Sequence, residues 1–240
     1  MPDATLPAAP LADKLKASAS APSLAGEPVL RLDDVHVTFP TDDGEVKAVD
    51  GVSYVVHRNE VLGIVGESGS GKSVTSMAIL GLLPPSARVT GHIWFDGRDL
   101  LALGERELQK LRGGPISMVF QDALASLNPV FTVGSQIAEA VRAHGPASRH
   151  EARDRAIELL DVVGIPSPRE RVDQYPHEFS GGMRQRAMIA MAIANDPVVL
   201  IADEPTTALD VTIQAQVLEL LHETQECTRS AILLLSLIHI

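Results

Sequence analysis

The 240-residue sequence predicts an α/β fold in which a mostly parallel sheet is flanked by helices, preceded by antiparallel β strands and interrupted by an inserted helical subdomain. Polar and apolar residues alternate over residues 29–39, as they do in strands with one buried face. Three later runs are almost entirely apolar, which is typical of strands inside a parallel sheet. More than 130 residues separate the first two of these runs, too many for one crossover connection.

The start of the chain differs in composition from the rest. Residues 1–26 are dominated by Ala, Pro and Ser and show no apolar period, so we expect a disordered lead-in there and a folded domain at residues 27–240. A secretory signal is the competing interpretation. Asp13, Lys14 and Lys16 disfavour it, because they interrupt the only place where a continuous apolar segment could lie.

The strands follow in order along the chain. "VLRLDDVHVTF" predicts the first strand, and "TDDGEV" predicts a turn that leads to a second strand at about residues 48–56. The three apolar runs lie at residues 61–65, 198–202 and 231–235, and we expect all three to be buried on both faces of the parallel sheet.

The long insertion predicts a helical subdomain at about residues 122–185. Within it, "EARDRAIELLDVVG" places apolar residues at helical spacing and charged residues on the other side. Gly164 and Pro166 predict the end of this helix.

Composition limits the possible partners. The chain has 20 lysines and arginines against 31 aspartates and glutamates, a formal net charge of -11, which disfavours general binding to nucleic acid. No run of about 18 apolar residues is present, so we expect no membrane span. The single cysteine, Cys227, excludes an internal disulfide and fits a reducing compartment.

A phosphate-binding loop is the strongest motif. "GESGSGKS" matches GxxxxGK[ST] directly after an apolar strand and before "SVTSMAILGLL", which predicts a helix as far as Pro84. A chance match in a chain of this length is of order 1%. Lys72 is predicted to neutralise the β and γ phosphates and the Ser73 hydroxyl to bind magnesium, so the predicted ligand is a nucleoside triphosphate with Mg²⁺. The predicted nucleotide-binding residues of this loop are Gly66, Glu67, Ser68, Gly69, Ser70, Gly71, Lys72 and Ser73.

An acidic pair follows the second apolar run in "VVLIADEPTTALD". Carboxylates at the carboxyl end of a buried strand fit the ligand crevice of a parallel sheet. Asp203 is predicted to hold magnesium, and Glu204 to polarise the attacking water as general base. Taken alone, an Asp-Glu pair in this position is more often a solvated turn or a helix cap, and the phosphate loop is what favours the functional interpretation.

"FSGGMRQRAMIAMAIANDP", about 20 residues before the acidic pair, resembles the signature segment of ATP-binding cassette (ABC) proteins. Together with "VGESGSGKS", "MVFQDALASLNP" and "LIADEPTTALD", it is similar to the peptide/nickel branch of ABC importers over residues 29–235. The resemblance implies a P-loop NTPase core that hydrolyses ATP at the cytoplasmic face of the membrane. It also implies transmembrane permease subunits and a substrate-binding protein as partners, and dipeptides, oligopeptides or nickel as cargo.

The signature segment makes physical sense as a second phosphate grip. Ser180, Gly181 and Gly182 are predicted to open a helix running through Met183 to Asn195, where backbone NH groups and a hydroxyl face an anion. One nucleotide cannot occupy both grips. The resemblance implies that two chains, identical or related, pair head to tail, each signature covering the ATP held by its partner.

The resemblance assigns three further roles. Gln121 would contact magnesium and the attacking water and link the site to the helical region, although an ordinary solvated glutamine is the alternative. Phe39 either stacks on adenine or belongs to the core. Asp210 either contacts the dimer interface or caps the helix "VTIQAQVLELL", or does both. Asn59 departs from the family pattern, because Gly is usual there.

The C-terminal end also departs from the pattern. The family spacing implies a histidine at position 237 that contacts the γ phosphate, and this chain has Leu237. His239 lies roughly 6–7 Å further along an extended strand and is not assigned the role. We interpret the chain as C-terminally truncated, with "SLIHI" foreign to the gene, and expect ATP binding with poor turnover.

Other functional classes fit less well. A soluble ABC protein of DNA repair or translation would need a long coiled-coil insertion or a tandem cassette, and neither is present in the sequence. A P-loop kinase or GTPase has no place for "FSGGMRQR". A truncated, non-hydrolysing nucleotide-binding module and an ABC ATPase for another class of cargo stay open as alternatives.

Overall fold

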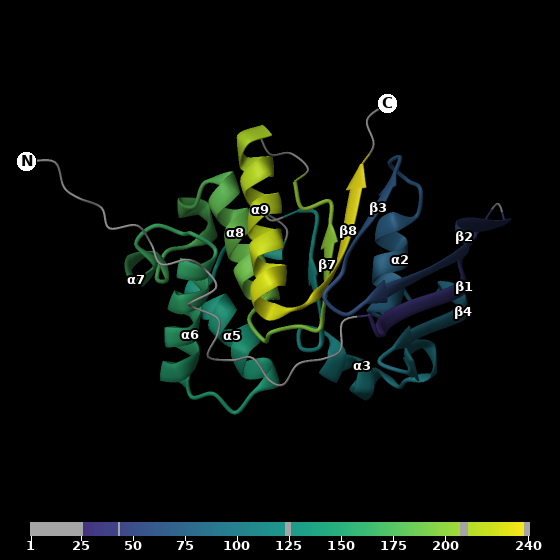
Figure 1. Ribbon diagram of the computed structural model, residues 1–240, viewed down its shortest axis with the longest axis horizontal. Helices are drawn as coiled ribbons and strands as arrows, with labels where there is room; N and C mark the ends of the chain where they lie inside the picture. Colours follow the sequence, from purple (N-terminus) through teal and green to yellow (C-terminus); the bar gives the residue numbers. More distant parts are fainter. Residues whose placement is uncertain (1–25, 43, 123–125, 207–210, 238–240) are drawn as a thin grey trace, which may run out of the picture.

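The computed structural model describes residues 26–42, 44–122, 126–206 and 211–237. Residues 1–25 of the predicted lead-in lie outside this range, as does Asp210. The described chain contains two β sheets and a group of helices (Figure 1). The helices α5, α6 and α7 gather on one side and the strands β1, β2 and β4 on the other, with α8, α9 and the second sheet between them.

The first sheet is antiparallel and has the strand order β2-β1-β4-β5. Its strands are β1 (Pro28–Thr41), β2 (Gly44–His57), β4 (Arg88–Phe95) and β5 (Arg98–Asp99). The alternation that predicted β1 is confirmed, because Leu30, Leu32 and Val37 are buried while Arg31 is exposed. The second strand begins four residues earlier than predicted.

The second sheet is parallel, with the order β3-β8-β7-β6. Its strands are β3 (Val61–Gly66), β8 (Ala231–Leu237), β7 (Val199–Asp203) and β6 (Ile116–Val119). All five residues of β7 are buried, as predicted for a strand with both faces covered. The same prediction is wrong for β3, because this strand lies at the edge of the sheet and leaves Val61 and Val65 48% and 60% exposed.

Helices surround the sheets. They are α2 (Lys72–Ile79), α3 (Glu105–Leu111), α5 (Val133–His144), α6 (Arg149–Val162), α7 (Pro168–Arg171), α8 (Gly181–Ala192) and α9 (Val211–Thr228), with 3₁₀ turns at Leu100–Ala102 and Pro176–Glu178. In the part of the chain that the structure describes, no helix is both long and apolar enough to cross a bilayer. The α8 helix is continuous past residue 185, so the expected subdomain boundary does not coincide with the end of an element.

Local sequence sets where the helices begin and end. Helix α6 starts with a capping box in which Ser148 accepts from the Glu151 backbone and the Glu151 side chain accepts from the Ser148 backbone. It ends just before Gly164, whose φ of 72° stops the helix as predicted. Helix α2 is shorter than predicted. Gly81 takes a φ of 61°, and Leu82 N bonds to Met77 O, so the chain leaves the helix before Pro84.

Asn59 lies in the turn before β3 with a φ of 61°, a conformation that Gly or Asn tolerates. Its side-chain oxygen and its carbonyl both accept hydrogen bonds from the buried Gln225 of α9, at 2.7 and 2.8 Å. The asparagine therefore ties α9 to the strand that leads into the phosphate loop, a tie to which a glycine could contribute only its carbonyl.

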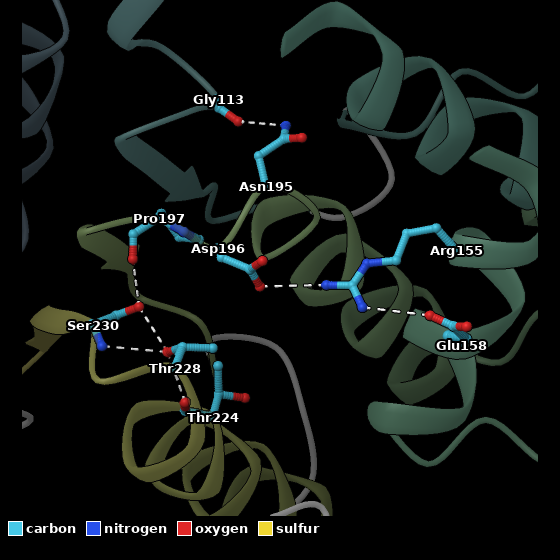
Figure 2. Close-up of polar contacts among 9 residues, drawn as sticks. All are labelled: Gly113, Arg155, Glu158, Asn195, Asp196, Pro197, Thr224, Thr228 and Ser230. Atoms are coloured by element: carbon cyan, nitrogen blue, oxygen red, sulfur yellow. Dashed lines mark hydrogen bonds and ion pairs between the residues drawn. The ribbon is translucent and has the colours of Figure 1, made fainter. Parts of the chain in front are cut away.

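A small polar network closes the junction between α9 and β8 (Figure 2). The Thr228 hydroxyl donates to Thr224 O at 2.8 Å and accepts from Ser230 N at 3.3 Å, with the Ser230 hydroxyl oxygen 2.7 Å away. The Ser230 hydroxyl in turn donates to Pro197 O. In contrast, the buried Thr224 hydroxyl has no hydrogen-bond partner among the residues that the structure describes, which costs stability.

The two threonines give a matched pair of variants. Thr224→Val removes an unpaired buried hydroxyl and is expected to raise the free energy of unfolding by about 1 kcal/mol. Thr228→Val removes a hydroxyl with two partners and is expected to lower it by about 1–2 kcal/mol. Urea denaturation followed by circular dichroism measures both. A Thr224→Val protein less stable than the parent would show that this hydroxyl is not a cost.

Candidate functional site

The predicted site residues from β3, β6 and β7 meet where these parallel strands end. β3 leads into the phosphate loop, β7 ends at Asp203, and Gln121 is the second residue after β6. Because the three strands are parallel, their carboxyl ends lie at the same edge of the sheet, which is where ligands bind in α/β proteins.

The phosphate loop needs its glycines at specific positions. Gly69 and Gly71 have φ values of 79° and 88°, in the left-handed region. A Cβ on Gly71 would also lie 2.4 Å from the Ala48 carbonyl oxygen of β2. Gly66 has no positive φ, but a Cβ there would lie 2.8 Å from the Ser70 hydroxyl. Residues 67–70 are exposed, so their backbone is accessible to a ligand.

Lys72 is the first residue of α2 and is only 8% exposed. Its ammonium donates to the carbonyls of Gly66 and Glu67 at 2.9 and 2.8 Å and to the Ser70 hydroxyl at 3.3 Å. The ammonium is thus held inside the curve of the loop, where an anion would meet it together with the loop backbone.

Two of the three predicted magnesium ligands, Ser73 and Asp203, are in direct contact, and the third is Gln121. The Ser73 hydroxyl donates to Asp203 Oδ1 at 3.0 Å, which joins α2 to the end of β7. Burial raises the pKa of the Asp203 carboxyl, and the neighbouring Glu204 adds to this, against the opposing effects of the Ser73 hydrogen bond and Lys72. A hard cation beside these two oxygens would relieve the buried charge, so the donor set fits Mg²⁺. In the described residues no group of three or more His, Cys, Asp or Glu side chains could hold a metal ion.

Glu204 lies 7% exposed beside Lys72, with 4.0 Å between its Oε1 and the Lys72 ammonium. The Gln121 amide donates to Glu204 Oε2 at 2.6 Å, so residues 83 positions apart in the chain are in direct contact. The Glu204 backbone has a φ of 47°, and its NH donates to Leu235 O at 3.0 Å. A left-handed glutamate is strained, and such strain is concentrated at functional sites.

The signature residues lie on a different element. Ser180 is the N-cap of α8, and its hydroxyl accepts from Met183 N at 3.3 Å. Ser180 and Gly181 are exposed, so the start of α8 is accessible. The helix ends at Ala192 rather than at the predicted Asn195, and residues 193–195 form a turn.

A family model described as ABC transporter matches residues 49–207. The chain belongs to the ABC transporter family. It is 54% identical over 212 residues to the dipeptide transport ATP-binding protein DppD of Bacillus subtilis, covering 88% of this chain and 63% of that protein. It is 53% identical over 210 residues to the oligopeptide transport ATP-binding protein OppD of the same organism, covering 87% of this chain and 59% of that protein. The chain therefore spans about three fifths of the length of these curated relatives.

Solved ABC cassettes share the fold. The dimeric structure of the bacterial ABC transporter cassette MJ0796 aligns with a TM-score of 0.77 and 29% identity, over 86% of this chain and 87% of that one. A dimeric post-hydrolysis state of MJ0796 bound to ADP and Pi aligns with a TM-score of 0.76 at the same identity and coverage. The expected α/β core with antiparallel N-terminal strands is confirmed.

The roles predicted for Phe39 and for position 237 stay predictions. Phe39 is partly buried against the core of the antiparallel sheet, as the core alternative predicts, and its stacking on adenine stays a prediction. Leu237 pairs with Gly66 in the register of β8 and β3, so position 237 lies beside the start of the phosphate loop. His239 lies outside the described residues.

Sequence reasoning missed a cavity of about 640 Å³ that begins at the cassette's Ser73, Gln121 and Asp203. It extends between the sheet and the helical layer. Its further lining includes Met77, Met118, Met188, Met191, Ala140 and His144. No motif marks this cavity, because its walls come from α2, β6, α5 and α8, which meet only in the folded chain.

The raised pKa of Asp203 has a consequence for stability. A carboxyl whose folded-state pKa lies above its unfolded value destabilises the fold when it is ionised, and the penalty disappears as the pH falls through the raised pKa. Asp203→Asn should therefore raise the melting temperature of the nucleotide-free cassette at pH 7, with the difference from the parent shrinking toward acid pH. Thermal melts across this pH range measure it. Asp42→Asn, at an exposed position, is the control, and equal behaviour of the two variants would contradict the assignment.

Proposed function

We propose that this chain is the ATP-binding and ATP-hydrolysing subunit of an ABC importer, driving uptake of dipeptides or oligopeptides. The observation that carries the proposal is the contact of Gln121 with Glu204, beside Lys72, Ser73 and Asp203, at one edge of the parallel sheet. This arrangement brings together the phosphate loop, two proposed metal ligands and a candidate general base.

ATP is bound by its phosphates. The backbone of residues 66–71 and the start of α2 supply neutral donors, and Lys72 supplies the only buried positive charge among the described residues. The gripping groups are local, so the chain's net charge of -11 does not oppose binding. Ser73 and Asp203 would hold Mg²⁺, which neutralises charge on the phosphate oxygens.

Hydrolysis requires a water in line with the bond between the γ phosphorus and the β,γ-bridging oxygen. Glu204 accepts a proton from this water as its oxygen bonds to the γ phosphorus, and the electron pair of the broken bond leaves on the ADP oxygen. Gln121, already in contact with the Glu204 carboxylate, orients the same water through its amide. The products are ADP and inorganic phosphate.

A second cassette completes the site. The exposed start of α8, with the Ser180 hydroxyl and the NH groups of Gly181 and Gly182, offers an anion grip that the Lys72 loop of the same chain does not use. We propose a head-to-tail dimer in which this grip covers the partner's γ phosphate. The name of the MJ0796 structure, a dimer bound to ADP and Pi, supports this arrangement.

Transport itself belongs to other subunits. We propose transmembrane permease subunits and a substrate-binding protein as partners, with the cassette at the cytoplasmic face of the membrane. The names of the two Bacillus subtilis relatives favour peptides over nickel as cargo. The residues that select cargo would lie on the partners.

Glu204→Gln tests the proposal. The amide keeps the shape of the side chain but cannot accept the proton, so hydrolysis should fall at least a hundredfold while Mg·ATP binding persists. The bound ATP should then hold two chains together, which light scattering after gel filtration measures as a dimer. Lys72→Ala is the control and should stay monomeric. A Glu204→Gln chain that binds Mg·ATP yet remains a monomer would contradict the shared site.

Position 237 tests the expectation of poor turnover. Since residue 237 pairs with Gly66, a histidine there is placed beside the phosphate loop. Leu237→His should raise steady-state phosphate release by about tenfold or more at saturating ATP, because it adds a donor toward the γ phosphate. Leu237→Gln, of similar size, should give a smaller gain. Equal rates for Leu237→His and the parent would contradict the expectation.

A further inference from the structure

The turn that follows the signature helix carries a polar side chain that no motif explains. Asn195 donates through its single amide nitrogen to Gly113 O at 2.8 Å and to Ala140 O at 3.0 Å. Gly113 lies in the turn before β6, and Ala140 lies in α5. Figure 2 shows the Asn195 amide pointing at the Gly113 carbonyl, while its neighbour Asp196 faces Arg155 of α6.

This bridge spans the far end of the cavity. Gly113 and Ala140 both line it, and the Ser73, Gln121 and Asp203 side chains line its other end. Helices α5 and α8 pack against each other and against β6 and β7 in one apolar cluster. Beside the cavity, where fewer side chains meet, the two hydrogen bonds from the Asn195 amide add a polar tie between α5, the end of α8 and the core. The His144 ring also lies against this turn, since a Cβ on Gly114 would be 3.0 Å from its Nδ1.

The turn before β6, at residues 112–115, also contacts the ends of other elements that carry predicted site residues. Arg112 donates to Leu80 O and Gly81 O, at the end of α2, at 2.6 and 2.9 Å. Val198 N and Val199 N, at the start of β7, donate to Pro115 O at 2.9 and 3.0 Å. Helix α2, strand β6, strand β7 and helix α8 thus share one anchor at residues 112–115, opposite the ends that carry the proposed site.

We propose that Asn195 is a positioning residue, which holds the signature helix at the angle to the core that a second cassette requires. Its role rests on the proposed function, because it acts through Ser180 on the partner's nucleotide. It should not act on nucleotide binding within one chain, since Lys72, Ser73 and Asp203 belong to the core elements α2 and β7. Loss of the bridge should weaken dimer closure and spare Mg·ATP affinity.

The test places Asn195→Ala and Asn195→Asp in the Glu204→Gln chain. Alanine removes both hydrogen bonds, and aspartate keeps the shape of the side chain but turns a carboxylate toward two carbonyls. Asp196→Asn is the control, because it makes the reverse exchange at the adjacent, exposed residue and leaves an oxygen that can still accept from Arg155. Binding of a fluorescent ATP analogue with Mg²⁺ gives the affinity of one chain, and light scattering gives the ATP concentration for half-maximal dimer.

We expect the two Asn195 variants to need about tenfold more ATP for dimerisation, with Mg·ATP-analogue affinity within about twofold of the parent and with Asp196→Asn unchanged. Dimerisation equal to the parent in both variants would overturn the positioning role. So would failure of both to fold, as judged by circular dichroism, or equal loss of affinity and dimerisation. If the Glu204→Gln parent itself fails to dimerise, the proposed function is what fails.

Discussion

Two buried carboxylates, Asp203 and Glu204, face one buried ammonium, Lys72, at the edge of the parallel sheet. Uncompensated buried charge is costly, and the raised pKa of Asp203 expresses that cost. Hydrogen bonds from Ser73 to Asp203 and from Gln121 to Glu204, together with the Lys72 ammonium, offset part of this cost. The two buried carboxylates therefore favour a bound cation, and the phosphate loop favours a bound anion. A triphosphate with its magnesium ion would provide both charges.

Backbone geometry makes the same region specific. Two features disfavour any other residue at position 71: the φ of 88°, and the Ala48 carbonyl, which leaves no room for a Cβ. Strand β2 of the antiparallel sheet is therefore in direct contact with the phosphate loop. Glu204 accepts a strained φ of 47° and is fixed by the bond from its NH to Leu235 O. Strands β2 and β8 thus hold the loop and the base in place without contributing a reactive group.

Sequence patterns predicted the features that neighbouring residues determine. They missed the features that depend on contacts between distant segments of the folded chain. The end of α6 before Gly164 and the fully apolar β7 were predicted correctly, because both signals lie within a few residues of the chain. The edge position of β3 could not be read, since an apolar run looks the same at an edge and in a sheet centre. Strand β6 was missed because it has only four residues. The motifs named Gln121 and Glu204 separately, but only folding across 83 positions shows that they touch.

Because α8 is long, a small change in its angle to the core moves its Ser180 end by a large distance. Helix α8 has 12 residues and is therefore roughly 18 Å long. A rotation of about 10° around its Asn195 end would move the Ser180 end by about 3 Å, as far as the length of a hydrogen bond. The apolar contacts of α8 oppose such a rotation along most of the helix, and fewer side chains do so where it borders the cavity of about 640 Å³. The position of the exposed signature end consequently depends also on the opposite end of the helix, where polar contacts to the turn before β6 carry no chemistry of their own.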